Sequence, residues 1–305
     1  MDPPGGDRIM TWLVTGSEGK LGRVLVRHLD AAGIPCRTFD RSPGERPDHR
    51  TGDVADPHDA SEALSGVEGV IHLAALPSDS AGTPAEILRT NALGTIALAD
   101  RALKAGCERF VYASSINALG VTGPGRPDDL PIDARQRAHP VTPYQISKRL
   151  AEEYLLYLHR ATPLEVVILR PPYIADAGDY TTWHAPDFIG LPRSASELFA
   201  YVDLDDCARA FVLAAVGSGA GPGPYFLSAE DTCSEEPTRR LLDCWTGAVR
   251  EDFDASLDSN EHRSLLDFTP TAAALSWWPT TSWRAASTAP FDHAVQRRTE
   301  YNDVT

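Results

Sequence analysis

Short apolar runs alternate with longer amphipathic segments over the first two thirds of the chain. The runs are short enough for buried strands, whereas between them apolar positions recur every three or four residues, as in helices that pack one face on a sheet. The pattern predicts strands at residues 11–15, 36–39, 69–73, 110–113 and 165–169, and helices at 21–32, 85–105, 143–159 and 205–215. Gly33 and Gly106 follow two of these helices, where glycine commonly ends a helix. The alternation is typical of βαβ units, so we expect an α/β fold with a doubly wound parallel sheet.

The periodicity becomes less regular after Ala175, where Pro, Gly and aromatic residues interrupt it. This change predicts a small C-terminal lobe that caps a site and binds the substrate. We therefore expect a flexible start at residues 1–9, a sheet-forming domain at 10–170, a lobe interleaved with the last sheet elements at 171–286, and a polar tail at 287–305.

Composition narrows the class of protein. The chain has 305 residues, 42% of them apolar and 23% charged, which is typical of a globular protein. A net charge of -15 argues against nucleic acid as a partner, because phosphates would be repelled. The five cysteines are scattered without metal-ligand spacing, and no apolar stretch is long enough for a signal peptide or a membrane span. We expect a cytoplasmic protein that acts on a small molecule, without a metal and without a membrane.

A glycine run follows the first predicted strand and leads into the first predicted helix. Gly16, Gly19 and Gly22 allow a tight turn, close approach of the backbone to a pyrophosphate and close packing of helix on strand. Asp40 ends the second strand, 18 residues beyond Gly22, where a carboxylate can bind the ribose hydroxyls of an adenosine. The run predicts a Rossmann-type dinucleotide site that prefers NAD, while Arg41 beside the acid leaves NADP open.

Tyr144 and Lys148 are four residues apart, which places a phenol and an ammonium on one face of the predicted helix. A fixed positive charge favours a phenolate, so such a tyrosine can exchange a proton with a carbinol or ketone oxygen. Ser114 and Ser115 follow the strand at 110–113, at a sheet edge where catalytic side chains collect. A tyrosine packed in the core beside a surface lysine is the alternative for this pair when it is considered alone.

Together these motifs resemble the extended short-chain dehydrogenases/reductases, often called NAD-dependent epimerases/dehydratases. The resemblance covers about residues 10–284 and includes Gly52-Asp53-Val54, His72-Leu73-Ala74-Ala75, Asn91 and Leu169-Arg170-Pro171 in the order of that family. It implies that Ser115, Tyr144 and Lys148 are the catalytic residues. It further implies that the cofactor is bound by Gly16, Gly19, Lys20, Leu21, Gly22, Asp40, Arg41, Asp53, Val54, Leu73, Ala74, Ala75, Asn91, Tyr144, Lys148 and Pro172. A homodimer through helices 85–105 and 143–159 is implied as well.

Departures from the family pattern bear on the substrate. Ile116 and Asn117 stand where sugar-nucleotide 4,6-dehydratases carry an acid pair, so elimination of water is not expected. Tyr173 replaces an asparagine that is common in the nucleotide-sugar enzymes, which favours a smaller sugar, a uronic acid or a ketone. We expect the substrate to meet Ser78, Asn117, Tyr173 and Arg193, whereas Trp183 and His184 fit a loop packed on the lobe equally well.

The expected reaction is hydride transfer between a nicotinamide and a carbinol or keto carbon of a sugar or sugar-like compound. A dehydrogenase and an epimerase both use this chemistry, and the sequence leaves the choice open. A reductase or dehydrogenase of a secondary-metabolite ketone or uronic acid is the alternative. A dinucleotide sensor without turnover is disfavoured, because it would have no use for Ser115, Tyr144 and Lys148 together.

Overall fold

A seven-stranded parallel sheet forms the centre of the molecule. The computed structural model describes residues 10–120, 129–134, 136–184, 198–242 and 248–285. The strand order is β10-β7-β5-β4-β1-β2-β3. The strands are β1 (Trp12–Thr15), β2 (Cys36–Asp40), β3 (Arg50–Thr51), β4 (Gly69–His72), β5 (Arg109–Ala113), β7 (Glu165–Arg170) and β10 (Tyr225–Phe226). The order reverses between β1 and β4, which is the doubly wound arrangement that the sequence predicts.

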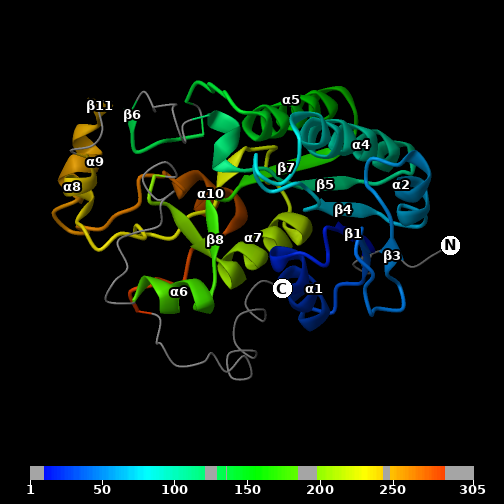
Figure 1. Ribbon diagram of the computed structural model, residues 1–305, viewed down its shortest axis with the longest axis horizontal. Helices are drawn as coiled ribbons and strands as arrows, with labels where there is room; N and C mark the ends of the chain where they lie inside the picture. Colours follow the sequence, from blue (N-terminus) through cyan, green and yellow to red (C-terminus); the bar gives the residue numbers. More distant parts are fainter. Residues whose placement is uncertain (1–9, 121–128, 135, 185–197, 243–247, 286–305) are drawn as a thin grey trace.

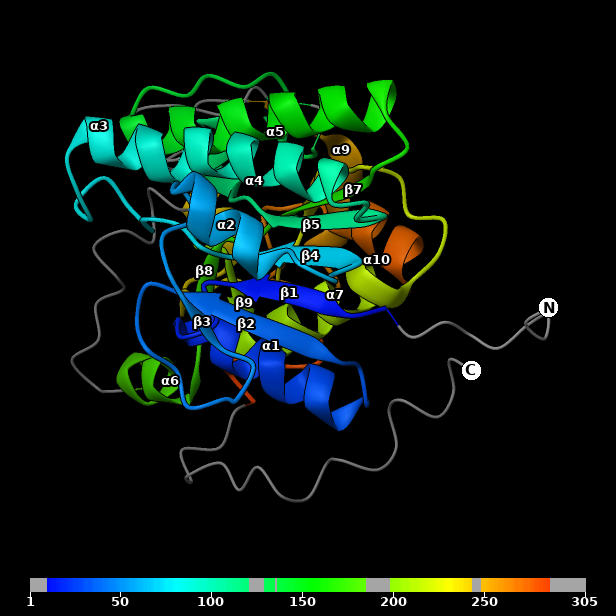
Figure 2. The ribbon, with the colours of Figure 1, turned by 90° about the vertical axis from the view of Figure 1, so that its right-hand side faces the viewer.

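Helices cover both faces of this sheet (Figures 1 and 2). One face carries α1 (Lys20–Ala31) and α7 (Leu204–Val216), and the other carries α2 (Pro57–Ala63), α4 (Thr95–Lys104) and α5 (Pro143–Ala161). Successive strand residues contribute to opposite cores: Leu13 packs with the α5 side and Val14 with the α1 side. Because both faces are buried, the strands are apolar throughout, as the short apolar runs predict.

The prediction of one continuous helix at 85–105 is wrong. The segment begins one residue earlier as α3 (Pro84–Ile87), continues as a π-helical turn η1 (Leu88–Gly94) and ends as α4. Within the turn the Asn91 amide bonds both backbone groups of Leu76, and the Thr95 hydroxyl donates to the Asn91 carbonyl. These tertiary bonds widen the helix at Asn91, and a wider turn of this kind is common at functional sites.

Smaller elements lie to the left of the central strands in the view of Figure 1. They are η2 (Ile116–Leu119), β6 (Asp129–Leu130), β8 (Tyr173–Ala175), α6 (Ala177–Trp183), β9 (Tyr201–Asp203), α8 (Thr238–Leu242), β11 (Ala248–Val249), α9 (Glu251–Ser256) and α10 (Thr269–Leu275). β8 pairs with β9, and β6 pairs with β11, in two separate parallel pairs. The predicted helix at 205–215 is confirmed as α7. Within the described ranges, no helix is both long and apolar enough to cross a membrane.

Candidate active site

The glycine loop between β1 and α1 is closely packed against the loop that follows β4. Gly16 has φ +72°, and a Cβ built on it would lie 2.7 Å from the backbone nitrogen of Ala74. A Cβ on Gly22 would lie 2.1 Å from the Gly16 carbonyl oxygen. Gly19 precedes α1 without a side-chain cap, and the first turn of α1 contains no acid. The helix therefore presents its N-terminal amides to an anion, as a pyrophosphate site requires.

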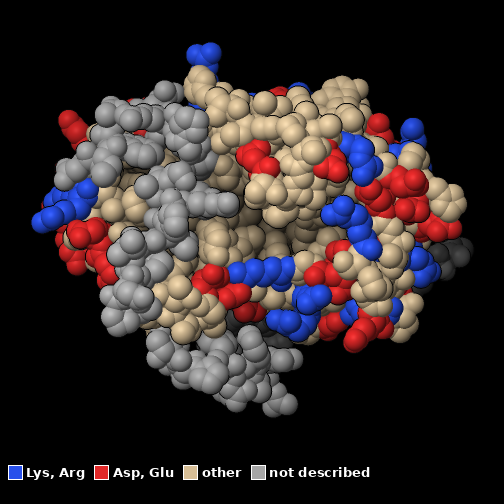
Figure 3. Space-filling view, in the orientation of Figure 1, with Lys and Arg blue, Asp and Glu red and all other residues tan. Residues whose placement is uncertain are grey.

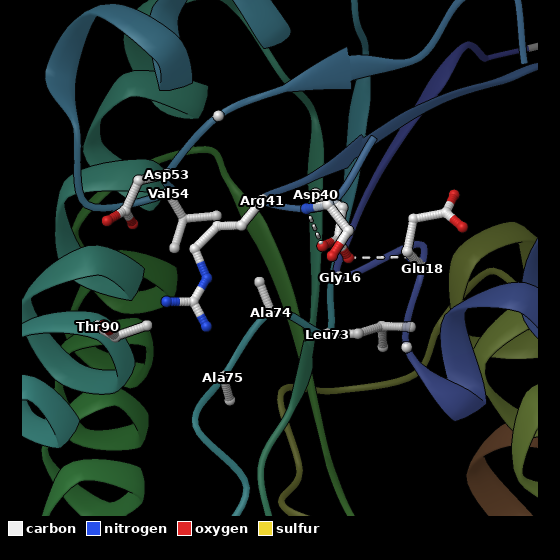
Figure 4. A pocket seen from close by; sticks show the side chains of 13 residues that line it. Gly16, Glu18, Asp40, Arg41, Asp53, Val54, Leu73, Ala74, Ala75 and Thr90 are labelled. Atoms are coloured by element: carbon white, nitrogen blue, oxygen red, sulfur yellow. Dashed lines mark hydrogen bonds between the residues drawn. The ribbon is translucent and has the colours of Figure 1, made fainter. Parts of the chain in front are cut away.

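A cavity of about 260 Å³ opens beside this loop (Figure 4). Nine residues predicted to bind the cofactor line it: Gly16, Gly19, Asp40, Arg41, Asp53, Val54, Leu73, Ala74 and Ala75. Glu18, Ser42, Gly52 and Thr90 line it as well, and the sequence analysis did not assign them. Glu18 lies inside the glycine run and Ser42 lies two residues after Asp40, so their closeness to the motif was the available sign.

Two carboxylates border the cavity in different environments. The Asp40 carboxylate accepts hydrogen bonds from the backbone nitrogens of Glu18, at 3.0 Å, and Ser42, at 2.9 Å, which fixes it at the end of β2. Asp53 accepts from Arg89 at 2.8 Å. Partial burial acts to raise the pKa of Asp53, but bonds from the Ala55 amide and Arg89 outweigh it and hold that pKa below its usual value. Asp53 is therefore an anionic acceptor at neutral pH.

Lys148 lies where α5 meets the end of β5. Its side chain is buried, and the ammonium donates to the Ala113 carbonyl at 2.7 Å. The same ammonium is 5.9 Å from the centre of the Tyr144 ring and 5.0 Å from that of Tyr112. Burial lowers the pKa of Lys148 to about 8, although the charge of Glu152 acts in the opposite direction. A buried cation thus faces the phenol ring that the sequence places on the same side of the helix.

Ser115 lies at the start of η2, and Tyr144 lies at the start of α5, the helix that carries Lys148. Ser115 caps η2, and its hydroxyl accepts from the Asn117 amide at 3.2 Å. Tyr144 is the second residue of α5 and is half-buried, and its backbone nitrogen donates to Asp79 at 2.8 Å. Because Lys148 contacts Ala113, two residues before Ser115, the sheet edge and the helix that carry the predicted catalytic residues are in direct contact.

Three other residues predicted to bind the cofactor do not line the cavity. Asn91 is buried beneath the loop after β4, where its amide also contacts the Ser147 hydroxyl at 3.2 Å. It therefore holds this loop against α5 and does not line the cavity. Leu21 is buried in the first turn of α1, and Pro172 follows β7 and is partly buried.

The Lys20 ammonium is engaged by residues of β8 and α6. It lies 2.9 Å from carboxylate oxygens of both Asp176 and Asp179, and it donates to the Ile174 carbonyl at 3.0 Å. The two acids form the capping box of α6, and the Tyr173 hydroxyl donates to Asp179 at 2.7 Å. The lysine predicted to meet the pyrophosphate thus links the glycine loop to β8 and α6.

The predicted substrate residues do not form one cluster. Tyr173 belongs to the Lys20 group, Asn117 contacts Ser115, and the Ser78 hydroxyl bonds that of Ser80 at 2.9 Å. Arg193 lies outside the described residues. Figure 3 shows a hollow near the middle of one face, with acidic and basic side chains at its rim.

Trp183 and His184 contact residues that follow them by many positions in the chain. Trp183 is buried, with its ring centre 5.3 Å from that of Tyr201 and 5.7 Å from that of Trp283. The His184 ring bonds the Trp283 carbonyl at 2.9 Å. These contacts fit the interpretation of both as packing residues.

The sequence profile of the NAD dependent epimerase/dehydratase family matches residues 12–225. The chain belongs to this family. This finding confirms the resemblance drawn from the motifs, and it makes the protein an enzyme of the NAD-dependent epimerase/dehydrogenase group. The match covers the glycine loop, the whole of α5 and the central sheet as far as β10.

Several curated proteins are similar to this chain. Sterol demethylase protein B of Methylococcus capsulatus is 33% identical over 56% of this chain and 53% of that protein. The NAD-dependent glucose-6-phosphate dehydrogenase of Haloferax volcanii is 31% identical over 57% of this chain and 70% of that protein. UDP-glucose 4-epimerase of Mycolicibacterium smegmatis is 28% identical over 88% and 94%. The chain thus matches about half the length of the first of these relatives and nearly all of the third.

Solved structures share the fold. A short-chain dehydrogenase/reductase superfamily protein from Agrobacterium tumefaciens, with bound NAD, has a TM-score of 0.71 and 23% identity, covering 90% of this chain and 94% of that one. A mutated uronate dehydrogenase has a TM-score of 0.63 and 21% identity, covering 90% and 83%. At these identities the likeness concerns the architecture, and it confirms the predicted α/β fold.

Proposed function

We propose that the protein transfers a hydride between NAD and a carbinol or keto carbon of a sugar or sugar-like compound. The observation that carries this proposal is the position of Lys148, whose buried ammonium joins the end of β5 to the ring of Tyr144. Burying a charged ammonium costs free energy of folding. A chemical role for Lys148 is therefore the simpler explanation of its position.

The proposed roles follow from what each side chain can donate or accept. When bound, the nicotinamide ring takes up the hydride or returns it. The Tyr144 hydroxyl exchanges the proton of the substrate oxygen, and the Lys148 charge stabilises the phenolate between turnovers. The Ser115 hydroxyl, at the strand end, donates to the same substrate oxygen and holds it in place.

The proposed cofactor is NAD. The fixed carboxylate of Asp40 suits two ribose hydroxyls and repels a 2′-phosphate. Figure 4 shows the Arg41 side chain extending over the cavity on the side of Thr90. Its guanidinium could therefore pair with the 2′-phosphate of NADP. We propose the remaining cofactor contacts for the cavity residues, Leu21, Gly22, Asn91 and Pro172, with Lys20 meeting the pyrophosphate in exchange for its carboxylate partners.

The substrate class rests on the relatives and on the lobe. Sugars or sugar nucleotides appear in the names of the Haloferax and Mycolicibacterium relatives. A uronic acid or other small ketone is the second candidate, because a uronate dehydrogenase shares the architecture and Tyr173 is tied to Asp179. We assign substrate contacts to Ser78, Asn117, Tyr173 and Arg193 as part of this proposal.

The decisive experiment is a titration of the purified protein with NAD and with NADP, followed by absorbance at the reduced-nicotinamide band with a substrate panel. The panel contains glucose 6-phosphate, glucuronate, galacturonate and UDP-glucose. Reduced NAD accumulating with one compound makes the protein a dehydrogenase, whereas conversion of UDP-glucose to UDP-galactose without net reduction makes it an epimerase. Absence of binding of both cofactors would overturn the proposal.

We further propose a cytoplasmic homodimer. The four cysteines in the described ranges are free thiols, which suits a reducing compartment. Ile146, Leu150 and Tyr157 form one face of α5 with exposed fractions of 37%, 48% and 51%. Leu93, at the adjoining turn, is 61% exposed. Clustered exposed apolar side chains on two neighbouring helices are typical of an interface.

Leu150→Glu is expected to convert the dimer to a monomer, because a carboxylate buried near a symmetry axis would meet its own copy. Size-exclusion chromatography with light scattering measures the mass. Val216→Glu is the control, since Val216 is 53% exposed at the end of α7, on the opposite face of the sheet. A wild-type protein that elutes as a monomer, or a Leu150→Glu variant that stays dimeric, contradicts the proposed interface.

Lys148→Met is expected to lower turnover by about a thousandfold and to raise stability at neutral pH. Below pH 8 the wild type keeps a charged lysine buried, so its removal increases the free energy of unfolding by on the order of 1–2 kcal/mol, after the loss of the bond to Ala113. The gain shrinks between pH 8 and 10.5, where the folded lysine is already neutral while the unfolded one is charged. Denaturant titrations at several pH values measure it.

Lys104→Met is the matched control, because Lys104 is exposed at the end of α4. Its replacement should leave stability and turnover unchanged. A Lys148→Met protein that is less stable than the wild type at pH 7 would show that the ammonium contributes to the fold.

A further inference from the structure

A buried carboxylate, Glu152, lies one turn beyond Lys148 on α5. Its side chain has no exposed surface, and it accepts three hydrogen bonds. The Ser114 hydroxyl donates at 2.6 Å, and Arg170 donates through Nε at 2.8 Å and through Nη2 at 2.6 Å. Neither motif reasoning nor the family match assigns a role to this residue.

The two residues that donate to Glu152 lie at two strand ends of the proposed site. Ser114 directly precedes Ser115 at the end of β5, and Arg170 ends β7 and directly precedes Pro171 and Pro172. Two backbone hydrogen bonds also join these strand ends. The Ser114 amide donates to the Leu169 carbonyl, and the Ile116 amide donates to the Pro171 carbonyl. The carboxylate therefore holds both strand ends against the helix that carries Tyr144 and Lys148.

The charges around Lys148 make Glu152 important for a second reason. The groups facing this region are Lys148, Tyr144 and Glu152 on α5, Tyr112 on β5, His72 on β4 and Arg170 on β7, with Arg149 at the edge, 3.7 Å from Glu152. Burial lowers the pKa of His72 to about 3 and raises that of Tyr112, so both are neutral near pH 7. Glu152 is thus the buried anion that offsets two buried cations, Lys148 and Arg170.

On the basis of the proposed function, we propose that Glu152 is a positioning residue: it fixes Ser115 and the β7 end relative to α5 and keeps the Lys148 ammonium charged. If the ion pair between Glu152 and Arg170 served the fold alone, a different result would be expected. Buried pairs are often replaced by apolar residues without loss of stability, and activity would then return together with the fold.

The chain offers an unusually direct readout of the Lys148 charge. It contains three lysines, Lys20, Lys104 and Lys148. The pKa of Lys20 lies above its usual value because bonds and charges from Asp176 and Asp179 outweigh its partial burial. Lysine labelled with 13C at Cε therefore gives three resonances in the NMR spectrum, and the one titrating near pH 8 belongs to Lys148, with Lys148→Met as the assignment control.

The experiment compares Glu152→Gln, the double variant Glu152→Met/Arg170→Met, and the control Glu153→Gln. Glu153 is the next residue, is exposed and pairs with Arg149. In Glu152→Gln we expect the Lys148 titration to move down by about one pH unit or more, because Arg170 remains charged without its partner. Turnover should fall roughly tenfold to a hundredfold with the NAD dissociation constant within about threefold of the wild type. Glu153→Gln should change none of these.

The double variant separates positioning from folding. It removes both buried charges, so its melting temperature should return toward the wild-type value while turnover stays low, because Ser114 has lost its acceptor. Wild-type turnover in the double variant, or an unchanged Lys148 titration in Glu152→Gln, would overturn the proposal. The titration needs no substrate, so it decides the role of Glu152 even if the substrate panel fails and the proposed function is wrong.

Discussion

Replacing Tyr144 with phenylalanine is expected to reduce turnover by about a thousandfold and to leave NAD binding within about threefold of the wild type. The variant removes one hydroxyl from a half-buried side chain and keeps the ring that lies 5.9 Å from the Lys148 ammonium. The loss therefore falls on proton exchange with the substrate oxygen, and the fold and the cofactor cavity stay as they are. Steady-state rates with the active substrate and NAD titration by fluorescence measure both quantities.

The pH dependence of the same variant provides a second test. Any residual reaction in Tyr144→Phe must exchange its proton with water, so the pH profile should lose the limb that belongs to the tyrosine. Tyr157→Phe is the control, since Tyr157 lies on the same helix and is exposed. A Tyr144→Phe enzyme that keeps more than a tenth of the wild-type rate would contradict the assignment of Tyr144 as the acid and base.

Gly16→Ala is expected to weaken NAD binding by at least about a hundredfold and to destabilise the protein by on the order of 3 kcal/mol. Two effects add. An alanine at φ +72° is strained by about 1 kcal/mol, and its Cβ would lie 2.7 Å from the Ala74 nitrogen, which is backbone and cannot move aside cheaply. The collision separates the glycine loop from the loop after β4, and both line the cofactor cavity.

Gly33→Ala is a closely matched control for this experiment. Gly33 has φ +69°, almost the same backbone strain, but a Cβ there meets no atom within 4 Å. We expect it to cost about 1 kcal/mol and to leave NAD binding unchanged. Equal losses in the two variants, measured by thermal unfolding and by NAD titration, would show that strain alone explains the effect of Gly16→Ala and that the contact with Ala74 is unimportant.

The sequence alone determined the features that depend on neighbouring residues. Apolar runs and helical periodicity placed the central strands of the sheet and the helices α1, α5 and α7, because each period reflects which face of an element is buried. The glycine run also determined the turn between β1 and α1 that borders the cavity, since a tight turn and a bare helix end are local properties. The four-residue spacing of Tyr144 and Lys148 fixed their common face in the same way.

The tertiary structure decided whatever depends on partners far apart in the chain. Glu152 was visible four residues after Lys148, yet its burial follows from Arg170 and Ser114, which the sheet order brings beneath α5. Lys20 was assigned from its place in the glycine run, but its ammonium bonds acids of α6 more than 150 positions away. The π-helical turn at Asn91 likewise arises from the loop at Leu76. Local pattern specifies the elements, whereas the partners of each charged group are set by packing, because a buried charge must be matched by whichever groups the fold brings to it.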